Sequence, residues 1–152
     1  MALLRSMLIS LYQLQKHKKM GRKIFFHGIS AGILSAIACM IYNRIYFFAT
    51  EADFSKVLNT TTLIGINLGA CLLAAIGFWL LTKWLKKGGE IIFNFLFTIL
   101  SFASIVIPIS ISLPLNIKYP ELFPGLSIPM HFFPALAWFT LKPLFIKDIL
   151  NS

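Results

Sequence analysis

Four polar side chains that could bind a ligand or carry a proton lie inside long apolar runs of the sequence. They are Asn43, Arg44, Asn67 and His131. Ionisable residues within apolar spans are costly to place in a membrane, so they are candidate functional residues by default. Arg44 offers a permanent charge for a carboxylate or an anionic lipid headgroup, and His131 offers a titratable hydrogen-bond donor.

Two interpretations of these four residues are open. In the first, Arg44 extends into the headgroup region or pairs with Glu51 or Asp53, and the asparagine and histidine side chains form hydrogen bonds between helices. In the second, the four side chains line a small pocket that opens toward the outer face of a membrane and holds an anionic group.

Other chemistry that side chains could support is missing from the sequence pattern. No two histidines have the spacing of metal ligands, and Cys39 and Cys71 form no CxxC pair, so we predict no metal and no cofactor. The sequence has no GxSxG, Walker or dinucleotide motif and no catalytic triad, which disfavours an enzyme. No carboxylate lies deep in an apolar run, which disfavours an ion-coupled carrier.

The apolar runs that carry these residues have the length of transmembrane helices. Hydrophobic residues make up 58% of the 152-residue chain and charged residues 12%, against about 25% charged residues in a soluble domain. A helix that crosses the hydrocarbon core needs about 20 apolar residues. Such stretches occur at about 24–48, 61–81, 91–113 and 128–146. Because the links between them are short, we predict an all-α membrane domain over 24–152, folded as an antiparallel four-transmembrane-helix bundle.

The helical rise of about 1.5 Å per residue places the polar residues in this bundle. Arg44 would lie roughly 6 Å from the outer end of the first helix, with Asn43 beside it. Asn67 would lie roughly 9 Å into the second helix, and His131 roughly 5 Å into the fourth. The sequence therefore predicts one polar layer near the outer face.

The distribution of Lys and Arg predicts that both termini lie on the cytoplasmic side. Eleven of these residues flank one side of the four spans and two flank the other, with Arg44 inside a span. The eleven are Arg5, Lys16, Lys18, Lys19, Arg22, Lys23, Lys83, Lys86, Lys87, Lys142 and Lys147, and the two are Lys56 and Lys118. Orientation and anionic lipids account for the net charge of +9 better than nucleic acid does.

The basic N-terminal segment, 1–23, has three open interpretations. It could lie on the inner leaflet as an amphipathic helix, remain disordered, or be an extension upstream of a natural start at Met20.

Small residues and prolines predict how the helices pack. Two stripes of small residues are expected to pack the first two helices together, with a contact between two copies of the chain as the alternative. They are Gly28, Gly32, Ala36 and Cys39 in the first span and Gly65, Gly69, Ala70, Ala74 and Gly77 in the second. Two prolines are expected to disturb helices: Pro108 frees the carbonyl of Ser104, and Pro134 frees that of Met130. The link 114–127 is expected to lack regular helix, and Ser127 to cap the fourth helix.

These patterns predict a small, non-enzymatic multi-pass protein of a bacterial inner (cytoplasmic) membrane. We expect it to bind a lipid or to act as an accessory or assembly protein through the outer polar layer. Its expected partners are membrane lipids and either a second copy of the chain or another membrane protein, and not nucleic acid. The alternative function is a small transporter or channel.

Overall fold

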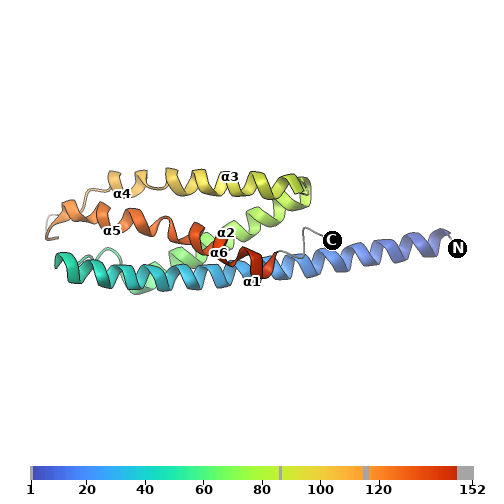
Figure 1. Ribbon diagram of the computed structural model, residues 1–152, viewed down its shortest axis with the longest axis horizontal. Helices are drawn as coiled ribbons and strands as arrows, with labels where there is room; N and C mark the ends of the chain where they lie inside the picture. Colours follow the sequence, from blue (N-terminus) through green and yellow to red (C-terminus); the bar gives the residue numbers. More distant parts are fainter. Residues whose placement is uncertain (1, 86, 115–116, 147–152) are drawn as a thin grey trace.

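The computed structural model describes residues 2–85, 87–114 and 117–146, and every regular element within them is helical. The elements are α1 (Ala2–Thr50), α2 (Thr60–Leu85), α3 (Lys87–Ala103), α4 (Val106–Ser110), the short 3₁₀ helix η1 (Pro120–Leu122), α5 (Phe123–Met130) and α6 (Phe133–Phe145). α1 packs mainly against α2 and α6, and α2 also packs against α3. α4 continues the line of α3, and α1 extends beyond the other helices toward its N-terminus (Figure 1).

Four helical segments are long and apolar enough to cross a membrane. They are Lys18–Thr50, Thr60–Leu85, Gly88–Ser110 and Pro120–Phe145. The predictions of an all-helical chain with four such segments are therefore confirmed. α1 is continuous from Ala2 to Thr50, so the basic segment 1–23 belongs, from Ala2 onward, to the same helix as the first span.

Glycines of α1 bring its backbone close to α2. A Cβ atom added to Gly28 would lie 2.8 Å from the Ala75 Cβ atom and 3.0 Å from the Cys71 carbonyl oxygen. One added to Gly32 would lie 3.0 Å from the Cα atom of Leu68. Only glycine allows this approach, so the first half of the packing prediction is confirmed.

The glycines of α2 do not take part in this contact. No atom lies within 4 Å of a Cβ atom added to Gly65 or Gly69. The expectation that the two GxxxG motifs face each other is therefore wrong. Leu63, Asn67 and Cys71 form the buried stripe of α2, and Gly65 and Gly69 lie about 200° around the helix from the first two of these residues.

Two prolines divide the third and fourth helical segments where the sequence predicted a disturbance. Before Pro108 the helix is interrupted at residues 104–105, and the Ile107 N–H donates to the Ser104 carbonyl at 3.1 Å. Before Pro134 it is interrupted at residues 131–132, which separates α5 from α6. Each proline lacks the N–H that would bond the carbonyl four residues earlier.

The fourth segment begins earlier than predicted. Helical structure is present from Pro120 and becomes α-helical at Phe123, not at 128, so part of the link 114–127 is regular helix. Pro124 is tolerated because it lies in the first turn of α5, where an N–H has no helical partner. Ser127 is no cap: it lies inside α5, and its hydroxyl donates to the Phe123 carbonyl at 3.1 Å.

Two groups of buried side chains hold the helices together. The first contains Trp138, Phe78 and Phe93, and an ion pair between Lys142 and Glu90 joins α6 to the start of α3 nearby. The second lies where the 51–59 loop meets α5, and its members include Phe54 and Phe123. Two tyrosines of α1, Tyr42 and Tyr46, hold α5 in place at this end.

Those two tyrosines donate hydrogen bonds to backbone carbonyls of η1 and α5. The Tyr46 hydroxyl bonds Leu122 at 2.7 Å, and the Tyr42 hydroxyl bonds Gly125 at 3.1 Å. The aromatic residues at this end of α1 therefore fix the position of α5, on which His131 depends.

Candidate functional site

The predicted polar layer is divided between two cavities. Asn67 and His131 line a large cleft together, whereas Asn43 and Arg44 line a smaller pocket beside the 51–59 loop. Leu58 lies in the wall of both. The two pairs are separated because Asn43 and Arg44 lie near the end of α1 beside the 51–59 loop, whereas Asn67 and His131 reach the cleft from α2 and from the turn between α5 and α6. A shared depth therefore does not produce a shared cavity.

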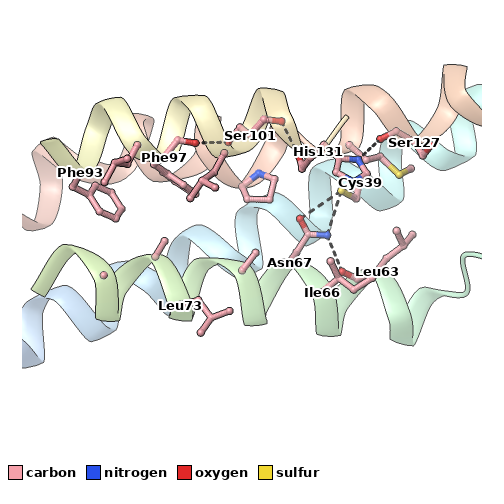
Figure 2. Close-up of a pocket in the computed structure, with 18 of the residues that line it drawn as sticks. Cys39, Leu63, Ile66, Asn67, Leu73, Phe93, Phe97, Ser101, Ser127 and His131 are labelled. Atoms are coloured by element: carbon pink, nitrogen blue, oxygen red, sulfur yellow. Dashed lines mark hydrogen bonds between the residues drawn. The ribbon is translucent and has the colours of Figure 1, made fainter. Parts of the chain in front are cut away.

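The large cleft lies between α2 and α3 and has a volume of about 490 Å³. Figure 2 shows Phe93 and Phe97 of α3 on one side and Leu73 and Ile66 of α2 on the other. Leu73 is 70% exposed and Ile66 59% exposed, although both line the cavity. The cleft therefore opens along its side, through a face of exposed apolar side chains.

One part of the cleft wall is apolar and another is polar. Ala74, Gly77 and Phe93 line the part near the α2–α3 connection. The polar residues are Cys39, Asn67, Ser101, Ser104, Ser127 and His131. No lining residue carries a permanent charge in the described part of the chain. A ligand of this cleft would therefore need a long apolar portion and a small uncharged polar portion.

Asn67 is held by a network that connects two helices, α1 and α2. Its amide donates to the Leu63 carbonyl at 2.7 Å and contacts the Cys39 sulfur at 3.4 Å. Its carbonyl oxygen accepts from the hydroxyl of Ser35. Asn67 is only 4% exposed, so it joins α2 to α1 and presents little free hydrogen-bonding capacity to the cleft.

Ser35 and Cys39 were not predicted as partners of Asn67. Both Cys39 and Cys71 are buried free cysteines. The available signal was helical spacing, because Gly28, Gly32, Ser35 and Cys39 recur every three or four residues on one face of α1.

His131 lies in the turn between α5 and α6, across the cleft from Asn67 (Figure 2). Its Nδ1 atom is 2.8 Å from the Ser127 carbonyl oxygen. A carbonyl can only accept, so the proton of the neutral ring is on Nδ1 and the lone pair is on Nε2. The interruption before Pro134 positions this ring, because it ends α5 at Met130.

Three serine hydroxyls in the cleft wall donate to their own helices. The Ser101 hydroxyl bonds the Phe97 carbonyl at 2.9 Å, and the Ser104 hydroxyl bonds the Ser101 carbonyl at 2.7 Å. Ser127 does the same with Phe123. Ser101 was not predicted as a residue of the site, although hydroxyls in apolar helices commonly bond the preceding turn in this way.

The smaller pocket has a volume of about 360 Å³ and a more polar wall. It includes Asn43, Arg44 and Asp53, and Arg44 is exposed. Among the described residues, no ion pair joins Arg44 to Glu51 or Asp53. The Ser55 backbone N–H donates to Asp53 at 2.8 Å and holds the pKa of that carboxyl below its usual range.

The described residues contain no group of three or more His, Cys, Asp or Glu side chains that could hold a metal ion.

The chain matches no known protein-family model, and comparison with the curated proteins and with the solved structures finds no match for its sequence or its fold.

Proposed function

We propose that this protein is an integral membrane protein that takes a lipid-like molecule from the bilayer into the cleft between α2 and α3. One observation carries the proposal: a cavity of about 490 Å³ is open on its side through apolar, exposed residues of two helices that are long enough to span a membrane. A binding site for a water-soluble ligand would instead open toward a polar surface.

The proposed orientation is an antiparallel four-helix bundle with both termini on the cytoplasmic side of an inner membrane. The excess of Lys and Arg beside the N-terminus and the α2–α3 connection supports it. In this orientation the polar wall of the cleft, with Asn67 and His131, lies in the outer half of the bilayer. The apolar wall near Phe93 lies in the inner half.

Dimensions support an elongated ligand. The lining residues of α2 extend from Leu63 to Leu81, a distance of roughly 27 Å at about 1.5 Å per residue. This length is close to the thickness of the hydrocarbon core, about 30 Å. A single alkyl or isoprenoid chain fits a cleft of this shape better than a compact solute does.

Photocrosslinking in vesicles tests the proposal. A long-chain lipid probe with a diazirine in its chain should label cleft residues of α2 and α3 well above exposed residues outside the cleft, such as Ile91 and Ile107. Ala70→Phe fills the cleft and should reduce this labelling about tenfold. Ile76→Phe is the matched control, because Ile76 is exposed on the same helix but does not line the cleft.

Two outcomes would contradict the proposal. In the first, labelling is spread evenly over every exposed apolar residue and Ala70→Phe has no effect. In the second, Leu73→Cys forms a disulfide-linked dimer that excludes the probe, which would show that a second copy of the chain covers the cleft. Movement of the probe from one leaflet to the other, measured in the same vesicles, would indicate the alternative function of a transporter.

The smaller pocket supports a second candidate function, contact with an anionic headgroup. Arg44 lines this pocket beside Asn43 and has no carboxylate partner within the described residues. A guanidinium can bind a phosphate group with two hydrogen bonds. Arg44→Gln should reduce the enrichment of phosphatidylglycerol over phosphatidylcholine among co-purified lipids. An unchanged ratio would remove this candidate.

A further inference from the structure

The polar wall of the cleft offers hydrogen-bond acceptors but has no free side-chain donor. The hydroxyls of Ser101, Ser104 and Ser127 all donate to carbonyls of their own helices. Each hydroxyl oxygen still has lone pairs that can accept. The three serines therefore present acceptors to a ligand.

His131 and Asn67 follow the same pattern. The Nδ1–H of His131 is bonded to Ser127, which leaves the lone pair of Nε2, and no described residue donates to Nε2. Both amide hydrogens of Asn67 are directed at the chain itself, one to Leu63 and one to Cys39. Every lining side chain with an N–H or O–H group thus has that group directed at the protein.

The backbone at the interruption between α5 and α6 also has a carbonyl without its usual helical donor. Met130 lines the cleft there, and Pro134, four residues later, has no N–H to donate to the Met130 carbonyl. A carbonyl in an apolar setting that lacks its helical donor favours a ligand that brings one.

The lack of charged side chains in the cleft wall further restricts the class of ligand. A carboxylate or phosphate has only acceptors when ionised, and it would meet the acceptors of this wall without a donor or a positive charge beside them. An ammonium group would bring donors, but no lining carboxylate is present in the described chain to balance its charge. An uncharged hydroxyl brings one donor and needs no counter-ion.

From this complementarity, and resting on the proposed function, we infer that the cleft selects a neutral lipid with a free hydroxyl group, such as a long-chain or isoprenoid alcohol. Its hydroxyl donates to Nε2 of His131, and its chain lies between α2 and α3. The cleft discriminates against ionised fatty acids and phospholipid headgroups.

A set of matched probes tests this inference on the full chain in vesicles. The set consists of a diazirine-bearing hexadecanol, its methyl ether and the corresponding carboxylate, compared at equal mole fractions in the bilayer and at neutral pH. The ether keeps the oxygen acceptor but loses the donor. We expect the alcohol to label the cleft about tenfold more than the ether, the value of one hydrogen bond in an apolar site, and the carboxylate to label it least.

Variants assign the selectivity to a residue. His131→Phe removes the Nε2 acceptor and should bring the alcohol-to-ether ratio close to one. Ser110→Ala is the control, because Ser110 is exposed on α4 and does not line the cleft, so it should keep the ratio of the unmodified protein. The probe series needs no variant, so the inference remains testable if His131→Phe fails to fold.

Two results overturn the inference but leave the proposed function intact. One is equal labelling of the cleft by alcohol and ether, and the other is a preference for the carboxylate. Failure of every probe to label the cleft would instead contradict the proposed function itself.

Discussion

Two faces of α2 carry small residues, but one packs closely against α1 and the other borders the cleft. On one face, Cys71 and Ala75 lie so close to Gly28 of α1 that an added methyl group would be 2.8 Å from the Ala75 Cβ atom and 3.0 Å from the Cys71 carbonyl oxygen. On the other, Ala70, Ala74 and Gly77 are equally small but line a cleft that α3 does not fill. Small residues thus give close contact on one side and open space on the other.

The difference arises from the partner helix. α1 has glycines opposite α2, and its backbone can approach. α3 instead presents Phe93, whose ring lies 3.6 Å from a Cβ atom added to Gly77 and packs edge-on against Phe78 with ring centroids 5.2 Å apart. This aromatic contact holds α3 near the α2–α3 connection, and the two helices separate beyond it (Figure 1). Small residues therefore produce a cleft where the neighbour cannot follow.

The closely packed face should be the more sensitive to added volume. Gly28→Ala places a methyl group against the Cys71 carbonyl and the Ala75 side chain, neither of which can move away without shifting α2. We expect a loss of about 2 kcal/mol in the free energy of unfolding, as for other overpacked cores. Unfolding in mixed detergent micelles measures it. Gly32→Ala should act in the same direction, and an unchanged midpoint for both variants would contradict the close approach of α1 and α2.

Disruption of the polar network around Asn67 should cause the next largest loss in the free energy of unfolding. Asn67→Leu removes the bonds to Ser35, Cys39 and Leu63 and leaves the Ser35 hydroxyl buried without its acceptor. A loss of about 1 to 2 kcal/mol is expected from the unpaired group. Ser35→Ala combined with Asn67→Leu is the control, because the double variant removes both partners and should recover part of the loss. Strict additivity of the two single effects would argue against the network.

Replacement of a buried polar residue in the closely packed region should raise the free energy of unfolding, whereas Asn67→Leu lowers it. His27 is fully buried against Trp138, with ring centroids 4.2 Å apart, and neither of its ring nitrogens has a hydrogen-bond partner among the residues that the structure describes. His27→Phe keeps a ring of similar size and removes two unpaired polar atoms, so it should raise the free energy of unfolding by about 1 kcal/mol. The same micelle assay applies. A lower stability would show that the nitrogens of His27 have a partner in the membrane.

The sequence predicted the helices and their interruptions better than it predicted the site. Apolar length reveals a span, and Pro108 and Pro134 disturb helices because they lack an N–H, whatever surrounds them. Depth along a helix can be counted in the same way, and Asn67 and His131 do line one cleft. These are local properties of the chain.

The rotation of each helix about its own axis could not be predicted from the sequence. This rotation determines which cavity or which neighbouring helix a side chain faces. Arg44 has a depth like that of His131 but points into a different pocket. GxxxG occurs in α1 and α2, yet only Gly28 and Gly32 face the neighbouring helix. Which face of a helix packs against its neighbour depends on the side chains of that neighbour, here Leu68 of α2 and the residues around it. The sequence of one helix alone does not contain this information.

The smallest loss of stability is expected at Gly69, which has no neighbouring atom. Gly69→Ala adds a methyl group with no atom within 4 Å, so the free energy of unfolding should not fall, and any rise should stay within the roughly 1 kcal/mol that the better helix propensity of alanine provides. The comparison with Gly28→Ala then isolates close packing from helix propensity, because both changes are chemically identical.

Gly65 and Gly69 could still pack two copies of the chain together. In that case Gly69→Ile would lower the dimer fraction in a micelle crosslinking assay, while the stability of the monomer stayed the same. Loss of monomer stability on Gly69→Ala would show that this face of α2 is covered from within the chain, and it would remove the contrast between the two glycine pairs.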